Sequence, residues 1–271
     1  MKQTKHIAMW AYPRSRSTVI TRAFENLDGC IVYDEPFLAP SISIRGEILG
    51  DENLLQLFKL NDIETNYKKV IQKITGDLPD GKLFSFQKIL ANHYLPEFGI
   101  DWAKKITNFF LIRHPQEVIL SFDRAVRKFN ITEPLTLQDV GFETLDQIFQ
   151  QIELITGQTS LVIHSDDIIK NPNSVLQWLC KNLGIAFDER MLRWKVGLKD
   201  SNLLFAQLYP NPEYHDSEPW FETLRSSETF IPYKKREIDL PDRLIPLLEE
   251  SMPYYEKLLQ HCHIFEWSEH R

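Results

Sequence analysis

The stretch MWAYPRSRSTVITRAF, residues 9–24, has the layout of a strand, a tight polar loop and a helix. An apolar run ends at Tyr12-Pro13, polar residues follow, and apolar positions from Val19 to Phe24 then repeat at helical spacing. This layout directs backbone N–H groups and a helix N-terminus at an anion. The nucleotide-hydrolase loop G-x-x-x-x-G-K-[ST] needs glycines and a lysine, and this stretch has neither. It therefore predicts an anion site of another kind.

The rest of the chain alternates between short apolar runs and amphipathic helical patterns. This alternation predicts an α/β fold with a central parallel sheet of about five strands, covered by helices on both faces. With 271 residues and 43% hydrophobic content, the chain is expected to form a single domain over 1–271. The expected strands are about 6–11, 30–33, 83–87, 106–112 and 160–164, and the clearest expected helices are 118–129, 145–155, 173–183 and about 241–260.

Residues 199–222 interrupt the alternation. They contain three prolines, clustered aromatic residues and no sustained period. A long irregular insertion in a compact domain is usually either mobile filler or a functional lid. We expect Tyr209, Tyr214 and Trp220 to line an apolar acceptor pocket beneath it.

Charge and composition limit the class of partner. The net charge of −7 argues against a broad nucleic-acid surface, so a polyanion must be held by a local basic cluster. The three cysteines are widely spaced, which indicates a reducing compartment. The apolar runs are too short for a signal peptide or a membrane span. These features predict a cytoplasmic protein without membrane insertion, and they leave its oligomeric state open.

Two basic motifs are candidates for the anion site. The first loop, residues 14–18, follows the first expected strand, where open parallel sheets place their ligand crevice. The second motif, RHPQEVILS, begins at Arg113 and ends at Ser121. Arg113 ends an expected buried strand, where an arginine is costly to leave unpaired. Its partner is either an acidic side chain of the protein or a second phosphate of the ligand.

Together the two motifs resemble those of the sulfotransferase superfamily, in which the first reads like Y-P-K-S-G-T-T and the second like R-x-P-x-x-x-x-x-S. This sequence departs from the first motif at Arg14, where lysine is usual, and at Arg16, where glycine is usual. A side chain at position 16 argues against a left-handed backbone there. The matching residues are Tyr12, Pro13, Ser15 and Thr18 in the first motif and Arg113, Pro115 and Ser121 in the second.

The resemblance implies a P-loop-like sulfotransferase fold with 3′-phosphoadenosine 5′-phosphosulfate (PAPS) as co-substrate, adenosine 3′,5′-bisphosphate (PAP) as product and no metal. It implies transfer of a sulfuryl group to a small-molecule acceptor, to a hydroxyl in preference to an amine. The cofactor-binding residues it implies are Arg14, Ser15, Arg16, Ser17 and Thr18 at the 5′ end and Arg113 and Ser121 at the 3′-phosphate.

Sulfuryl transfer needs a cation at the leaving oxygen and a base at the acceptor. Arg14 is the first candidate for the cation, and Lys88 is the second. For Lys88 the alternative is a strand-end lysine whose amine extends to water. Glu35 in IVYDEPF is the favoured base, because family branches with a related acidic-Pro-Phe segment are thought to use glutamate. His93 is the other candidate, and Asp34 is an alternative for the exposed carboxylate.

Two rival functions remain open at this stage. A divergent small-molecule kinase would depend on Mg²⁺, whereas a non-catalytic PAP-binding protein would turn over no acceptor. We interpret the HCH sequence at 261–263 as surface residues because no second cluster accompanies it at metal-ligand spacing. The charge run at 234–236 is either a solvated segment or a late contact to the 3′-phosphate.

Overall fold

The computed structural model describes residues 5–45, 56, 58–128, 132–197, 226–234 and 238–266. Its centre is a five-stranded parallel sheet with the strand order β2-β3-β1-β4-β5. The expected parallel sheet is therefore confirmed. The strands are β1 (Lys5–Ala11), β2 (Cys30–Asp34), β3 (Phe84–Leu90), β4 (Thr107–Ile112) and β5 (Leu161–His164).

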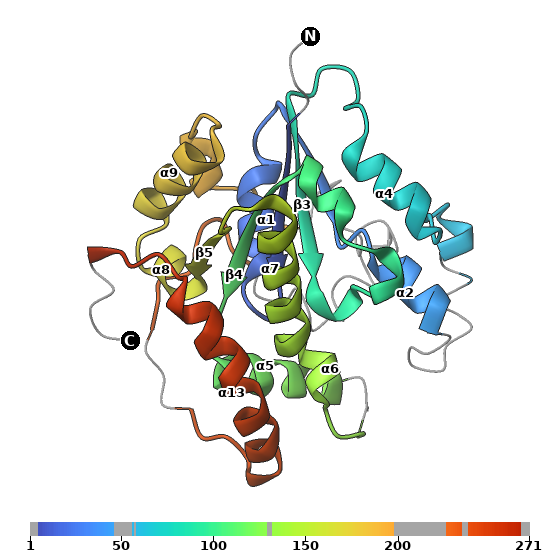
Figure 1. The fold of residues 1–271 in the computed structure, drawn as a ribbon. Helices are drawn as coiled ribbons and strands as arrows, with labels where there is room; N and C mark the ends of the chain where they lie inside the picture. Colours follow the sequence, from blue (N-terminus) through green and yellow to red (C-terminus); the bar gives the residue numbers. More distant parts are fainter. Residues whose placement is uncertain are drawn as a thin grey trace.

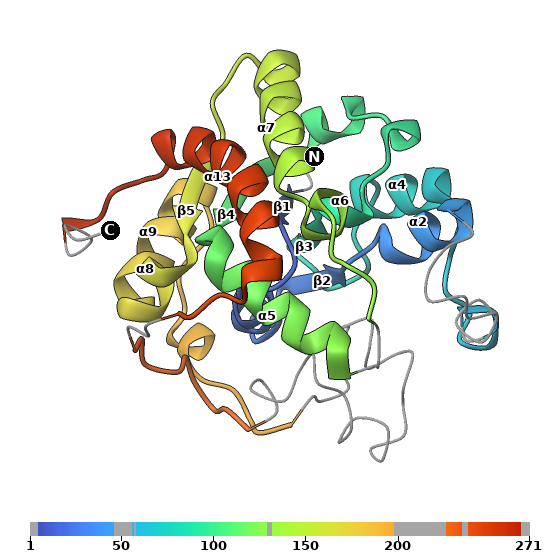
Figure 2. The same cartoon turned by 90° about the horizontal axis from the view of Figure 1, so that it is seen from below.

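Helices cover both faces of the sheet, as Figures 1 and 2 show. One face packs against α4 (Tyr67–Thr75), α5 (Pro115–Lys128), α7 (Phe142–Thr156) and α13 (Ile245–Gln260). The other packs against α1 (Ser17–Glu25), α8 (Ser165–Lys170) and α9 (Pro172–Leu183). The shorter elements include α2 (Leu38–Arg45), α6 (Leu137–Val140) and the 3₁₀ turns η1 (Ala91–His93), η2 (Pro96–Phe98), η3 (Asp101–Lys105), η4 (Glu189–Leu192) and η5 (Asp242–Leu244).

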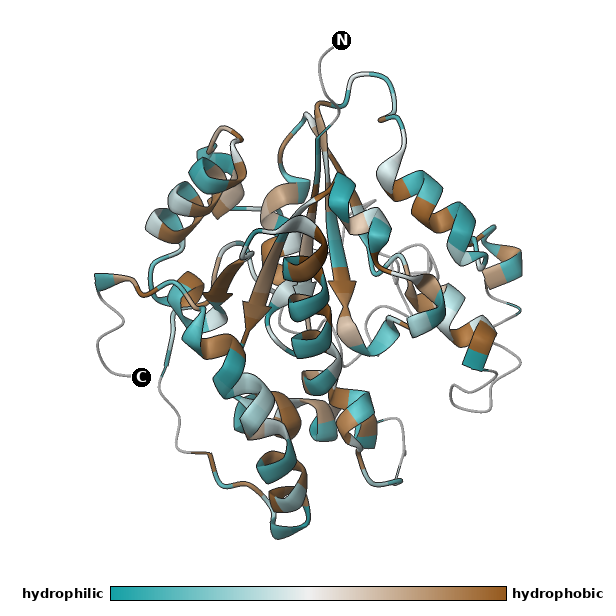
Figure 3. Cartoon of the chain, viewed as in Figure 1, coloured by the Kyte–Doolittle hydropathy of each residue, from teal (hydrophilic) through white to brown (hydrophobic). Residues whose placement is uncertain are grey.

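The central strand shows why the sheet is buried on both sides. Successive side chains of a strand point to opposite faces. Ile7, Met9 and Ala11 belong to one buried cluster, and Ala8 and Trp10 belong to the other. In Figure 3 the strands are largely brown, whereas teal residues lie on the helices around them. The apolar runs of the sequence are therefore strands that bury both faces.

The strand order decides which loops meet. Because β1 lies between β3 and β4, the loop that follows it lies between the carboxyl ends of those two strands. β3 continues to Leu90, three residues beyond the predicted end at 87. Lys88 therefore lies inside the strand, paired in register with Asp34, and not at the strand end as the sequence pattern predicted.

The predicted lid, 199–222, lies outside the described residues. On either side of it, Arg193 and Thr229 form an antiparallel bridge, and the N–H of Trp194 donates to the carbonyl of Glu228 at 2.9 Å. The chain therefore leaves and re-enters the described fold at neighbouring points.

Two glycines at the ends of α7 allow a comparison of backbone strain with close packing. Gly157 has φ = 65°, and a Cβ there would meet nothing within 4 Å; Gly141 has φ = 74°, and its Cβ would lie 3.0 Å from the Asn92 nitrogen. We expect Gly157→Ala to lower the free energy of unfolding by about 1–2 kcal/mol because of the left-handed φ. Gly141→Ala should cost at least about 1 kcal/mol more because it is also overpacked. Urea unfolding of the two variants measures the difference, and equal losses would show that the Asn92 backbone yields freely.

Candidate active site

The loop between β1 and α1 has two arginines in the left-handed region. Arg14 has φ = 61°, and Arg16, the N-cap of α1, has φ = 67°. The expectation that a side chain at position 16 excludes this conformation is therefore wrong. A left-handed non-glycine residue costs about 1–2 kcal/mol, and ion pairs of the Arg16 side chain are present to offset that cost. Within the loop, the buried hydroxyl of Ser15 donates to the Tyr12 carbonyl at 2.7 Å.

The two basic motifs meet in the folded chain. Arg14 Nε donates to Ser121 Oγ at 3.1 Å, and Arg113 Nη1 donates to the Arg14 carbonyl at 2.7 Å. The Tyr12 hydroxyl, buried beneath them, lies 3.4 Å from the Arg113 carbonyl. Residues about a hundred positions apart in sequence thus form one cluster at the carboxyl edge of the sheet.

Two carboxylates pair with the arginines of this cluster. Glu117, in the first turn of α5, accepts from Arg113 Nε at 2.7 Å and from Arg16 Nη2 at 3.1 Å, through the same oxygen, Oε2. Arg16 also pairs with Asp166 at the start of α8 and donates to Ser165 Oγ at 3.3 Å. Arg113 therefore has the acidic partner that the sequence left as one of two explanations.

The pKa shifts follow from this arrangement. Burial, together with the neighbouring Arg16, lowers the pKa of Arg113 to about 10, although Glu117 acts in the opposite sense. Burial alone would raise the pKa of Asp166, but His164 and Arg16 outweigh it and leave this pKa below its usual value. Burial and the nearby Asp166 and Glu117 raise the pKa of Tyr233, which lies beside the same charges.

A second, deeper cluster surrounds Lys88. Its side chain is 1% exposed, and its ammonium lies 2.8 Å from Asp34 Oδ1 and 2.8 Å from Glu35 Oε1. It also donates to Thr18 Oγ1, in the first turn of α1, at 3.4 Å. Burial acts to lower the pKa of Lys88, but the two carboxylates outweigh it and raise the pKa above its ordinary value. Lys88 is therefore a buried cation, and its amine does not extend to water.

The two candidate bases are neighbours. Glu35 adopts φ = 47°, and its N–H donates to the Lys88 carbonyl at 2.9 Å. Its second oxygen, Oε2, lies 3.6 Å from His93 Nδ1. Burial, then Arg45 and Lys88, lower the pKa of His93 to about 3, so the imidazole is neutral at ordinary pH. Asp34 and Glu35 are both buried, so Asp34 is not the exposed carboxylate of the pair.

Sequence reasoning missed Glu117 and Asp166 as members of the site. Glu117 lies inside the second motif, four residues after Arg113, in the first turn of α5, whereas Arg113 lies before that helix begins at Pro115. An acidic residue so close in sequence to Arg113 was the available signal. Asp166 had no comparable signal, because only the packing of α8 against the loop brings it to Arg16.

Two segments near the end of the sequence, 261–263 and 234–236, were also considered as candidates from the sequence. The prediction that 261–263 lies on the surface is wrong for Cys262, which is buried in a bridge with Val162, and His263 stacks on Trp178 at 4.1 Å. Among the described residues, no three His, Cys, Asp or Glu side chains are grouped as a metal site requires. Of the charge run at 234–236, the structure describes only Lys234, which is exposed.

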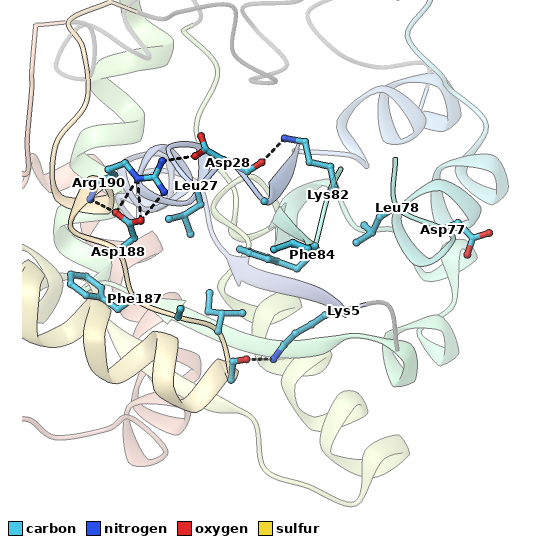
Figure 4. A pocket seen from close by; sticks show the side chains of 15 residues that line it. Lys5, Leu27, Asp28, Asp77, Leu78, Lys82, Phe84, Phe187, Asp188 and Arg190 are labelled. Carbon is cyan, nitrogen blue, oxygen red and sulfur yellow. Dashed lines mark hydrogen bonds and ion pairs between the residues drawn. The ribbon is translucent and has the colours of Figure 1, made fainter. Parts of the chain in front are cut away.

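A hollow of about 650 Å³ lies at the opposite, amino-terminal edge of the sheet (Figure 4). Leu27 and Phe84 line it together with charged residues, several of which pair with one another or with backbone carbonyls. Arg190 lies 2.6 Å from Asp28, and Lys5 donates to the Gly184 carbonyl at 3.1 Å. This hollow is separate from the arginine cluster.

In the described part of the chain, no helix is both long enough and apolar enough to span a bilayer.

Comparison with known proteins agrees with this fold. A family model described as "Sulfotransferase domain" matches residues 5–259. The chain therefore belongs to the sulfotransferase domain family. Two curated relatives from Arabidopsis thaliana, branched-chain-amino-acid aminotransferase-like proteins 2 and 1, are 27% and 26% identical to it. The matches cover 95% and 96% of this chain but 42% and 43% of the relatives, so the chain spans less than half of their length.

Solved structures show the same fold. The sulfotransferase domain of the Synechococcus PCC 7002 olefin synthase is 20% identical, with a TM-score of 0.50 and coverage of 92% of this chain and 95% of that one. A sulfotransferase from Alicyclobacillus acidocaldarius is 12% identical, with a TM-score of 0.56 and coverage of 97% and 99%. The expected sulfotransferase fold is confirmed.

Proposed function

We propose that this protein transfers a sulfuryl group from PAPS to a hydroxyl of a small-molecule acceptor, in preference to an amine. Family membership supports the reaction class. The single observation that carries the proposal further is the contact of Arg14 with both Ser121 and Arg113. This contact brings the first loop, which suits one phosphate, next to the second motif, which suits another. A nucleotide with phosphates at its 5′ and 3′ positions requires two such sites side by side.

The residues present fit such a nucleotide. At the 5′ end we assign the N-terminus of α1, the guanidinium of Arg14 and the hydroxyl of Thr18. Ser15 and Ser17 are buried, so we assign them contacts through their backbone N–H groups. The 3′-phosphate is assigned to Arg113 and Ser121. In this proposal the side chain of Arg16 holds the loop to α5 and α8.

The chemistry divides between the two clusters. PAPS supplies a sulfuryl group whose leaving group is a nucleotide phosphate, and cations at that end offset the charge that develops. We assign this role first to Arg14, which its position in the loop supports, and second to Lys88, which its contact with Thr18 supports. Glu35 is proposed as the base: Lys88 holds Oε1, and Oε2 is left to take the acceptor proton. Neutral His93 beside Oε2 is the second candidate.

PAP is expected to raise the melting temperature of the protein, whereas ADP and GTP are not. A ligand that binds only the native state at 100 times its Kd stabilises it by about 2.7 kcal/mol. For a chain of this size that corresponds to a shift of about 5 °C or more. Differential scanning fluorimetry with the three nucleotides measures the shift.

Turnover separates the proposal from its rivals. Transfer of labelled sulfuryl from PAPS to a panel of hydroxyl compounds should persist in excess EDTA, because no step assigned above uses a divalent cation. Loss of transfer in EDTA would favour a metal-dependent reaction. Tight PAP binding without transfer to any acceptor would favour a non-catalytic sensor.

A further inference from the structure

One carboxylate oxygen lies between arginines of the two phosphate motifs. Glu117 Oε2 accepts from Arg113 Nε at 2.7 Å and from Arg16 Nη2 at 3.1 Å, and Arg113 Nη2 also pairs with it. A phosphate bound at Arg113 would accept the same kinds of hydrogen bond. Glu117 thus occupies donors of Arg113 that the proposed function assigns to the nucleotide.

The donors of Arg113 are largely engaged. Its Nε and Nη2 face Glu117, and its Nη1 donates to the Arg14 carbonyl. The side-on face of the guanidinium, where a bidentate oxyanion binds, is therefore the face that Glu117 covers. The side chains of Arg113 and Glu117 are 14% and 20% exposed. The Glu117 side chain is thus at least as exposed to solvent as the Arg113 side chain. A phosphate that approaches Arg113 from solvent therefore also approaches the Glu117 carboxylate.

The carboxylates reduce the positive charge of the cluster. Arg14, Arg16 and Arg113 contribute three positive charges, and Glu117 and Asp166 contribute two negative charges, which leaves a net charge of +1. A phosphate placed against Arg113 would also lie beside the Glu117 carboxylate, which repels it. Moving that one carboxylate away would raise the net charge of the cluster to +2.

We infer that Glu117 is an internal competitor for the 3′-phosphate of the nucleotide, leaving Arg113 when the phosphate binds and returning when it departs. This inference rests on the proposed function. The carboxylate lowers the affinity for PAPS and PAP, and by re-pairing with Arg113 it speeds the release of PAP. Product release is a common rate-limiting step, so a competitor of this kind raises turnover at the expense of affinity.

A purely structural role for Glu117 predicts the opposite sign. If the carboxylate orients Arg113 and stays in place beneath the phosphate, its removal leaves the guanidinium misplaced and weakens PAP binding. If it competes, its removal tightens PAP binding. The direction of the change therefore separates the two roles.

The test compares Glu117→Gln with the wild type by calorimetry and by stopped-flow displacement of PAP. We expect PAP to bind about ten-fold more tightly, mainly through a slower off-rate. Adenosine 5′-monophosphate, which lacks the 3′-phosphate, should change less than about two-fold. With saturating acceptor, kcat should fall as release slows and the KM for PAPS should fall with it.

Two variants that remove the same charge serve as controls. Asp166→Asn removes a carboxylate that pairs with Arg16 but not with Arg113, so its effect on PAP should be clearly smaller. Asp80→Asn removes an exposed carboxylate just before β3, at the opposite edge of the sheet, and should have no effect. Equal gains in all three variants would indicate general charge steering and would overturn the inference.

The remaining outcomes also decide the matter. Unchanged or weaker PAP binding by folded Glu117→Gln overturns the competitor role while the proposed function stands. If the wild type binds PAP no better than adenosine 5′-monophosphate, the proposed function fails and the inference fails with it. Should Glu117→Gln not fold, Glu117→Ala carries the same expectation, and failure of both to fold would assign Glu117 a structural role.

Discussion

Replacement of Glu35 by glutamine is expected to lower kcat for sulfuryl transfer by about 10²–10⁴-fold, the usual contribution of a positioned general base. The Kd for PAP should stay within about two-fold, because Glu35 lies in the cluster of Lys88 and has no described contact with the arginine cluster. Glutamine keeps the shape of the side chain and loses its basicity. The measurement is single-turnover transfer from PAPS to an acceptor that the wild type accepts.

His93→Gln is the control for this assignment. Because its imidazole is already neutral, with a pKa lowered to about 3, His93 is a weak base. We expect its replacement to reduce kcat by less than about ten-fold. A large loss in His93→Gln, with normal turnover by folded Glu35→Gln, would transfer the role of base to the histidine.

Replacement of Lys88 by methionine is expected to lower the free energy of unfolding by about 3–5 kcal/mol. Removing one partner of a buried ion pair leaves its counter-charge uncompensated, and here two carboxylates, Asp34 and Glu35, lose their cation. Urea unfolding at neutral pH measures the loss. The triple variant Lys88→Met, Asp34→Asn, Glu35→Gln should recover part of it, because the uncompensated charges are then gone.

The pH dependence of this difference has a defined sign. The folded-state pKa of Lys88 lies above the ordinary value of 10.5, so its stabilisation is complete below about pH 10.5 and is lost as the pH rises through the folded pKa. The gap between wild type and Lys88→Met should therefore be full at neutral pH and should narrow as the pH rises through the folded-state pKa of Lys88.

An exposed lysine supplies the matched control. Lys69 pairs with Glu64 at 3.3 Å, but its side chain is 67% exposed. Surface pairs of this kind contribute about 0–1 kcal/mol, so Lys69→Met should change stability by less than about 0.5 kcal/mol. A loss equal to that of Lys88→Met would mean that burial is not the cause.

Local pattern was sufficient for four of the five strands. β1, β2, β4 and β5 lie within one residue of the predicted bounds, because a strand buried on both faces is an unbroken apolar run between turn residues. The prediction missed the end of β3, since Lys88 interrupts the apolar letters although its side chain is buried. A buried polar residue inside a strand has no signature in periodicity.

The partners of the charged residues required the fold. The sequence indicated that Arg14, Arg113 and Ser121 belong to phosphate-binding motifs, but their contact depends on β1 lying beside β4. The left-handed backbone at Arg16 is contrary to the conformational preference of a residue other than glycine. Ion pairs of its side chain with distant elements are present to offset the strain.

The sequence by itself therefore determined the parallel sheet, its covering helices and the two basic motifs, since these follow from the periodicity of apolar residues and from short spacings. Only the tertiary structure decided that Glu117 pairs with Arg113 and Arg16 and that Lys88 is buried between Asp34 and Glu35. The physical reason is that hydrophobic burial is encoded locally, residue by residue. The pairing of charges depends on which strand ends and helix starts are brought together by the order of the strands in the sheet.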